Sequence, residues 1–436
     1  MIYWAPLLHF YQPPIQVHWV LNKVCHESYR PLVQLFKDLP YAKVTVNING
    51  VLTEMLDEHG LSDVVSGLRG LAEKGQLEFT GSGKYHPILP LIPTEEMRRQ
   101  ILQNFQTNRR FFGDVYDPKG FFSPEMCYSR DILEPVMETG HEWLILSGVA
   151  CPVQWPMDVI HQVALEDTSI AVLFRDDILS NRISFQSIDS KGFVEHLRRL
   201  HQDGGDTYVV TAMDAETFGH HIQNWEKLFL AEVYEALEPS KVTREAVVPP
   251  RQPGRLAQQH GRLLRSRAAV ETQEIRVVTI SELVKAFRQG SVIEPRDSSW
   301  STMDGDLKDG NPYPLWRGKG NRIHELQWRH VKLTIELVNK AVKVSDTDNS
   351  KYYSSIARAL LDRSLHSCQF WWASRRPMWD INLVNRGLAQ QFEVILNAYK
   401  AISVSTISQE EKTECYDKVI VARDTADRIK EQLFTE

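Results

Sequence analysis

Two carboxylates in this chain, Glu125 and Asp214, occupy positions from which one active site could use both. Glu125 follows the short apolar stretch at residues 121–122, and Asp214 ends the apolar run at residues 208–213. Each is therefore expected at the end of a strand. Two carboxylic acids that meet across one bond are what a glycosidase needs, one as nucleophile and the other as proton donor. Cleavage or transfer at a glycosidic bond is the leading hypothesis.

The residues before Glu125 restrict how it is presented. Pro124 fixes its own backbone and holds Ser123 in extended geometry, so the turn should aim the glutamate side chain rigidly. A nucleophile requires such aim. The alternative is a structural glutamate at the first turn of a helix, where it would interact favourably with the helix dipole.

Asp214 and Glu216 are two residues apart, so in an extended strand their side chains share one face. When two carboxylates lie close together, repulsion keeps a proton on one of them to a higher pH. That is the state in which a general acid must be held. The alternative is that Asp214 or Thr217 caps a helix beginning near Phe218.

Polar residues near the ends of other strands could bind the hydroxyl groups of a sugar. His9 and Gln12 lie on a proline-stiffened loop after the first strand, although a histidine satisfied within a turn is an equal alternative. Glu78 ends the segment Gly75-Gln76-Leu77-Glu78. With Glu216 and His220, these residues are expected to line the cleft.

Eleven tryptophans could include platforms on which pyranose rings stack. The candidates are Trp225, Trp316, Trp371 and Trp372. Plain packing is the competing interpretation for each, because aromatic side chains fill cores first.

Other reaction chemistries lack their residues. His220-His221 has no HExxH spacing, so no metal site and no cofactor are expected. No phosphate-binding glycine loop and no GxSxG nucleophile turn occur. The five scattered cysteines form no CxxC pair and indicate reduced thiols.

The elements that must position these residues alternate between strand and helix over the first part of the chain. Strand candidates are residues 2–9, 42–48, 76–81, 120–123, 143–147, 170–174, 208–213 and 276–279. Helix candidates lie between them, at residues 27–39, 50–59, 61–74, 94–112, 129–139, 191–201 and 281–288. Such alternation predicts a parallel sheet, and acids at several strand ends favour a barrel over an open sheet.

Beyond residue 321 the pattern becomes helical, over residues 323–344, 352–373, 382–400 and 409–433. We therefore expect a β/α barrel domain at residues 1–290 and, at 291–436, an aromatic loop followed by a helical domain. Residues 240–271, rich in proline and arginine, are expected to be a mobile basic insertion.

The composition of the chain limits which partners are expected. A net charge of −6 gives no reason to expect nucleic acid or an anionic membrane. No apolar run is long enough to span a bilayer, and no basic segment precedes the first apolar run, so a cytoplasmic enzyme is expected. The oligomeric state is left open.

In several ordered segments the chain resembles glycoside hydrolase family 57. His9-Phe10-Tyr11-Gln12-Pro13 is similar to the family's first block, with Tyr11 where a second histidine is usual. Gly75-Gln76-Leu77-Glu78 and Ser123-Pro124-Glu125 are similar to the second and third. Residues 213–220 resemble the fourth block, and residues 368–372 correspond to the fifth.

The resemblance implies an incomplete, seven-stranded β/α barrel followed by helices. It also implies a retaining α-glycosidase or transglycosidase acting on α-glucans, with Glu125 as nucleophile, Asp214 as acid/base and no metal in catalysis. The two carboxyl groups should then lie about 5–5.5 Å apart. Two alternatives stay open: a carbohydrate-binding barrel that has lost catalysis, and a metal-dependent deacetylase or mannosidase with a related barrel.

Overall fold

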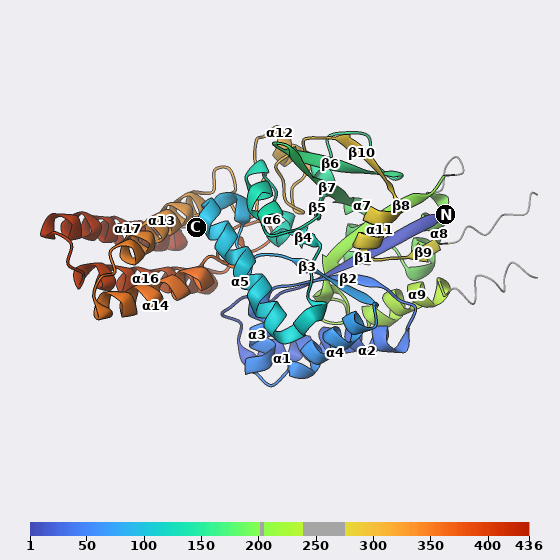
Figure 1. Ribbon diagram of the computed structural model, residues 1–436, viewed down its shortest axis with the longest axis horizontal. Helices are drawn as coiled ribbons and strands as arrows, with labels where there is room; N and C mark the ends of the chain where they lie inside the picture. Colours follow the sequence, from blue (N-terminus) through green and yellow to red (C-terminus); the bar gives the residue numbers. More distant parts are fainter. Residues whose placement is uncertain (201–204, 239–274, 436) are drawn as a thin grey trace, which may run out of the picture.

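A computed structural model describes residues 1–200, 205–238 and 275–435. It consists of a strand-rich body from which a group of long helices projects to one side (Figure 1). The insertion expected at residues 240–271 lies outside the described residues. Within the described ranges, no helix has an apolar stretch long enough to cross a membrane.

The strands form one sheet in the order β10-β6-β7-β5-β4-β3-β2-β1-β8, with β9 beside the first residues of β1. All pairs are parallel except β6 with β7. The strands are β1 Ile2–Phe10, β2 Val44–Ile48, β3 Leu77–Gly81, β4 Gly120–Phe122, β5 Trp143–Ser147, β6 Val159–Leu165, β7 Thr168–Arg175, β8 Thr207–Asp214, β9 Ile275–Val277 and β10 Arg288–Val292.

The parallel run from β7 to β8 is curled into an open half-barrel. The alternating pattern predicted the parallel sheet, and the resemblance implied an incomplete barrel, whereas the acids at strand ends had favoured a closed one. The two ends of this run lie close together: the amide of Asp176, just after β7, donates to the carbonyl of Val210 in β8 at 2.8 Å. Neither β6 nor β10 was predicted. Only Arg288, the first residue of the exposed β10, fell within a predicted helix, and β6 lacks the strict alternation of a half-buried strand.

Helices flank the sheet and fill the inside of its curve. The flanking helices are α1 His18–Val24, α2 Arg30–Asp38, α3 Gly50–Glu58, α4 Ser62–Glu73, α5 Thr94–Phe112, α6 Leu133–Glu138, α7 Asp177–Ser184, α8 Ser190–Arg199 and α9 Glu232–Ala236. Helix α11, Ile280–Ala286, packs Leu283 against inner-face residues such as Leu7 and Val210. Thr279 and Glu282 form a capping box at its start, which satisfies amides that would otherwise be unpaired.

The helical region is confirmed after residue 321, with different boundaries. It contains α13 Arg322–Lys343, α14 Asp348–Ser364, α15 Cys368–Trp371, α16 Ile381–Ser403 and α17 Gln409–Thr435, preceded by the short α12 Asp304–Lys308. The predicted helix at 352–373 is broken between Leu365 and Ser367. That break separates the bundle from a short helix lying against the strand-rich body.

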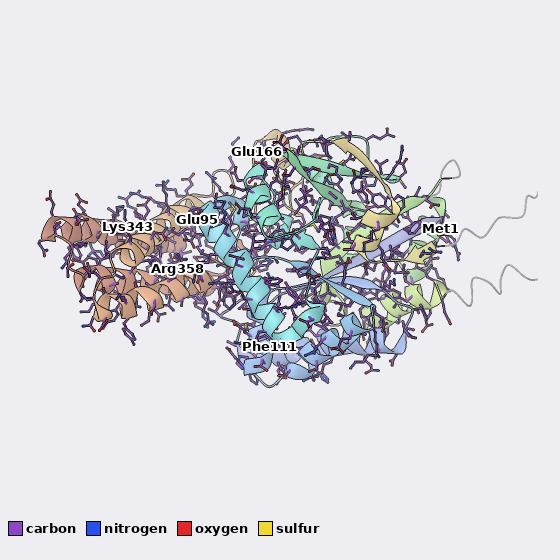
Figure 2. The ribbon with its side chains drawn as sticks, viewed as in Figure 1. Met1, Glu95, Phe111, Glu166, Lys343 and Arg358 are labelled. Atoms are coloured by element: carbon purple, nitrogen blue, oxygen red, sulfur yellow. The ribbon has the colours of Figure 1, made fainter. Side chains whose placement is uncertain are left out.

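A network of buried charges joins the bundle to α5. Arg358 on α14 donates to Glu96 at 2.9 Å and to Asp362 at 3.0 Å, and Arg99 donates to Asp362 at 2.7 Å. Figure 2 labels Arg358 near the start of α5, where Glu95 lies. This contact holds the segment after α14 against the barrel.

Candidate active site

The two predicted carboxylates follow strands that run in the same direction. Glu125 lies in a tight turn directly after β4, in the left-handed conformation at φ 58° and ψ 18°. Asp214 is the last residue of β8 and lies in register with His9 of β1. Because parallel strands have their carboxyl ends at the same edge of the sheet, both acids lie at that edge.

Two donors hold the Glu125 carboxyl group. The Trp300 indole Nε1 donates to Oε2 at 2.9 Å, and the Ser367 hydroxyl lies 3.2 Å from Oε1. The Trp300 amide also donates to the Glu125 carbonyl at 3.1 Å. The glutamate is therefore fixed by the loop that follows β10 and by the break between α14 and α15.

The environment favours the protonated form of Glu125. Burial, followed by the charge of Asp214, raises the pKa of Glu125 to about 8, while the donors Trp300 and Ser367 oppose the rise. The side chain is still 16% exposed, so a ligand can reach it. Asp214 is thus close enough for its charge to raise the pKa of Glu125.

Asp214 and Glu216 form a second acidic pair. Burial raises the pKa of Asp214, and the positive charge of Arg175 opposes this rise. Burial and the charge of Asp214 raise the pKa of Glu216, which accepts hydrogen bonds from Gln12 at 2.9 Å and from the Tyr29 hydroxyl. Burial opposes ionisation of all three acids, and the charge of Asp214 further opposes that of Glu125 and Glu216. The cluster therefore keeps a proton near neutral pH.

The alternative structural roles for these acids are not seen. Asp214 precedes a single 3-10 turn, Ala215–Thr217, but makes no capping hydrogen bond to it, and no α-helix begins near Phe218. Glu125 lies within a turn of three residues, Pro124–Met126, and not in the first turn of a longer helix whose dipole it could offset.

His9 connects the Asp214 strand to the Glu125 turn. Its ring stacks on Phe122 with centroids 4.9 Å apart, and its Nε2 lies 3.1 Å from Nε2 of His86. On its other side, Nδ1 lies 2.7 Å from Oδ1 of Asn47 on β2. His9 is thus buried, and it lies beside Asp214 on the neighbouring strand.

The structure places the other polar candidates in three environments. Gln12 and Glu216 bond to each other beside Asp214. His220 lies farther out and pairs with Glu27 at 2.7 Å. Glu78 is not brought to the carboxylate pair, and its placement is described next.

Glu78 is the second residue of β3, one layer below Thr80 and His9, toward the amino ends of the strands. Its carboxyl group accepts hydrogen bonds from the Thr45 hydroxyl at 2.8 Å and the Ser281 amide at 3.0 Å. The prediction had assumed that Glu78 ends its strand. Instead, Glu78 lies within the strand, and its carboxyl group is hydrogen-bonded to the first turn of α11.

Most of the proposed tryptophan platforms are core residues. Trp225 packs on Phe229, while Trp316 and Trp372 are 1% and 4% exposed and lie in apolar clusters. Trp371 on α15 is half-buried. Three of the four therefore have no free face on which a sugar could stack.

Sequence reasoning missed several residues around Glu125. Trp300 lies in the segment that was expected only to be an aromatic loop, and no local pattern distinguishes His86 or Ser367 from ordinary turn residues. Arg175 donates to the Ala212 carbonyl at 2.7 Å, and its guanidinium lies 6.0 Å from the centroid of the Trp300 ring. The hydroxyl group of Tyr11 lies 3.5 Å from the Cys368 sulfur. Contacts between distant segments, which no spacing rule reveals, define these roles.

Nothing in this arrangement resembles a ligand shell for a metal. Among the residues that the structure describes, no three histidine, cysteine, aspartate or glutamate side chains gather as metal ligands would.

Comparison with known proteins places the chain in a family. The family described as Glycosyl hydrolase family 57 matches residues 8–255. The chain is 29% identical over 244 residues to a 4-alpha-glucanotransferase of Thermococcus litoralis, covering 53% of this chain and 35% of that protein. An alpha-amylase of Pyrococcus abyssi is 27% identical over 222 residues, covering 49% and 32%. The chain thus spans about a third of the length of these curated relatives.

A solved structure extends the similarity over nearly all of the fold. A GH57-type branching enzyme from Pyrococcus horikoshii superimposes with a TM-score of 0.68 at 14% identity, covering 98% of this chain and 94% of that one. At this identity the likeness concerns the fold alone. The matched family segment, which spans more than half of the residues, carries the assignment: the chain belongs to glycosyl hydrolase family 57.

Proposed function

We propose that this protein is a retaining enzyme acting on α-glucans, with Glu125 as nucleophile and Asp214 as acid/base. The observation that carries the proposal is the environment of the Glu125 carboxyl group. It is partly exposed, it is hydrogen-bonded to Trp300 and Ser367, and the charge of Asp214 raises its pKa. The named activities of the matched relatives, alpha-amylase and 4-alpha-glucanotransferase, suggest the substrate class.

In the first step, an oxygen of ionised Glu125 attacks the anomeric carbon of the sugar. The bond from that carbon to the glycosidic oxygen breaks, and Asp214 gives its proton to the departing oxygen. The product is a glycosyl ester of Glu125. Trp300 contributes by donating to Oε2, which fixes the rotamer from which Oε1 can attack.

In the second step, ionised Asp214 removes a proton from an acceptor hydroxyl. The acceptor oxygen attacks the same anomeric carbon and Glu125 leaves as a carboxylate, so two inversions give net retention. Water as acceptor gives hydrolysis, and a sugar hydroxyl gives transfer or branching.

The reaction needs one proton on Asp214 and none on Glu125. At rest the preference is the reverse, because the pKa of Glu125 lies above that of Asp214. The proton must therefore leave Glu125 when a substrate binds, and the hydrogen bonds from Trp300 and Ser367 favour that ionised form. Closure of the site around a sugar strengthens these interactions, because it excludes water.

Azide rescue tests the two roles separately. In Glu125→Ala, azide should occupy the vacated space and give a glycosyl azide of inverted configuration from an activated α-glucosyl fluoride. In Asp214→Ala, the covalent intermediate still forms, so azide should give the retained product. The same anomer from both variants would refute the assignment.

A matched control and a substrate assay complete the test. Glu142→Gln changes an exposed glutamate whose side chain is 63% accessible, and it should retain wild-type turnover. With maltooligosaccharides, the wild-type protein should change the distribution of chain lengths. Binding without such a change would favour a carbohydrate-binding barrel, and loss of turnover with a chelator would favour a metal-dependent enzyme.

A further inference from the structure

A buried chain of polar side chains leads from β2 to the carboxyl group of Glu125. In order, its members are Asn47, His9, His86, Ser367 and Glu125. The successive heavy-atom distances are 2.7, 3.1, 2.9 and 3.2 Å. Asn47, His9, His86 and Ser367 are each no more than 3% exposed, so water does not compete for their hydrogen bonds.

The direction of the hydrogen bonds is set at Asn47. Its Nδ2 lies 2.9 Å from the Thr80 hydroxyl and 3.5 Å from the Gly81 carbonyl, which can only accept. Oδ1 therefore faces His9, and Nδ1 of His9 must carry the hydrogen. Burial lowers the pKa of His9 to about 4, so the ring is neutral and its Nε2 is an acceptor.

His86 must adopt the matching tautomer. Because Nε2 of His9 accepts, Nε2 of His86 has to donate across their 3.1 Å contact. Burial lowers the pKa of His86 as well. In the neutral ring, Nδ1 is left with a lone pair directed at the Ser367 hydroxyl, 2.9 Å away.

Within this chain of side chains, the single hydroxyl proton of Ser367 has two possible acceptors. It can go to Nδ1 of His86, in which case Glu125 must be protonated to donate to the serine oxygen. It can instead go to an ionised Glu125, in which case Nδ1 of His86 is buried without a donor. A buried acceptor that lacks a donor is destabilising, so the first arrangement is favoured at rest.

We propose that His86 is a positioning residue that acts through Ser367 to keep the Glu125 carboxyl group protonated until a substrate occupies the site. The inference rests on the proposed function only in naming Glu125 as the nucleophile. Ser367 thus does not simply donate to Glu125. Its hydroxyl can donate either to His86 or to Glu125, and His86 favours the first arrangement.

The backbone supports a fixed role for His86. Its φ is 58°, a conformation that non-glycine residues rarely adopt. Its carbonyl accepts from the Ser367 amide at 2.9 Å, so the two residues are joined twice. A turn held in this way can preserve the tautomer-dependent geometry.

Other titratable groups also face the two ends of this chain. Those around His86 are His9, Tyr11 and His366; those around Glu125 are Asp214, Tyr11, Cys127 and Cys368. Of these, Tyr11 could compete directly, because its hydroxyl group also contacts Ser367. The experiment therefore includes a variant that removes only this hydroxyl.

The pKa of Glu125 can be measured without reference to catalysis. In full-length protein whose glutamate carboxyl carbons carry an NMR-active label, the signal absent from Glu125→Gln identifies Glu125, and a pH titration gives its pKa. In His86→Phe, the Ser367 hydroxyl should donate to Glu125, because the competing acceptor is gone. The acid dissociation constant of Glu125 should then rise about tenfold, which corresponds to the gain of one buried hydrogen bond by the carboxylate. An unchanged or smaller constant would overturn the proposal.

Two further variants separate the possible causes. The effect of His86→Phe should vanish in a Ser367→Ala background, and its persistence there would mean that His86 does not act through Ser367. Tyr11→Phe should leave the Glu125 constant within twofold of wild type. A tenfold rise with Tyr11→Phe alone would transfer the role to Tyr11.

Asn47→Leu provides an independent test if His86→Phe does not fold. It removes the group that sets the direction, frees both histidine tautomers and should raise the Glu125 constant in the same direction, although Asn47 makes no contact with Glu125. No change in this variant would contradict the relay. Failure of the azide experiment would instead refute the catalytic roles and leave the titration result standing.

Discussion

At the scale of single residues, Glu125 is held in conditions that oppose its ionisation. Burial and Asp214 raise its pKa to about 8, above the ordinary value of 4.5. The folded state therefore binds a proton more tightly than the unfolded chain, and stability is lost as pH rises from about 4.5 through about 8. Sites that bind charged transition states commonly carry such a cost.

The first prediction follows from this linkage. Glu125→Gln cannot ionise, so its stability relative to wild type should increase across the same pH window by on the order of several kcal/mol. Below pH 4 the two proteins should unfold alike. Thermal unfolding at a series of pH values measures the difference, and a constant difference in Tm would contradict the raised pKa.

The second prediction concerns Trp300. Trp300→Phe removes the donor to Oε2 but keeps an aromatic ring, and a lost hydrogen bond to a charged group costs about 1.5–3 kcal/mol. We expect kcat on a maltooligosaccharide to fall about tenfold to a hundredfold. Trp19→Phe, on an exposed tryptophan of α1, is the control and should keep wild-type kcat.

At the scale of elements, α11 fills the inside of the half-barrel and binds Glu78. Its position depends on the capping box of Thr279 and Glu282, and on the Ser281 amide that Glu78 accepts. The sequence predicted a helix here and a strand before it. It did not indicate that the helix would pack inside the curve, because the contact joins segments about 200 residues apart.

The third prediction tests that cap. Thr279→Ala should lower the free energy of unfolding by about 1 kcal/mol, because it removes one half of the capping box. Urea unfolding measures the change. Thr413→Ala, at an exposed position within α17, should change it by no more than about 0.5 kcal/mol. Equal effects of the two substitutions would mean that the cap contributes nothing specific.

At the scale of the whole molecule, the helical bundle completes the site. Ser367 reaches Glu125 from the break between α14 and α15, and α14 is joined to the barrel through Arg358, Glu96 and Asp362. These two carboxylates are each 3% exposed at the side chain and depend on their arginine partners. Loosening this contact should therefore affect both stability and the site.

The fourth prediction is that Arg358→Met destabilises the protein by about 3–5 kcal/mol, since it leaves buried carboxylates with one partner fewer. Turnover should fall in parallel because Ser367 loses its support. Adding Glu96→Gln should recover part of the stability. Full activity in the single variant would show that the bundle does not hold Ser367 in place.

The sequence by itself determined the periodic features of this protein. Repeated strand and helix patterns specified the parallel sheet and the helical end, because local propensity and apolar spacing decide such elements. It also marked Glu125 and Asp214, since each ends an apolar stretch.

Tertiary structure alone decided how the acids are surrounded. Trp300, His86 and Ser367 reach Glu125 from separate segments, Glu78 is diverted to α11, and three proposed tryptophan platforms are buried. The reason is physical: hydrogen-bond partners and pKa values depend on burial and on atoms within a few ångströms, and those neighbours are far away along the chain.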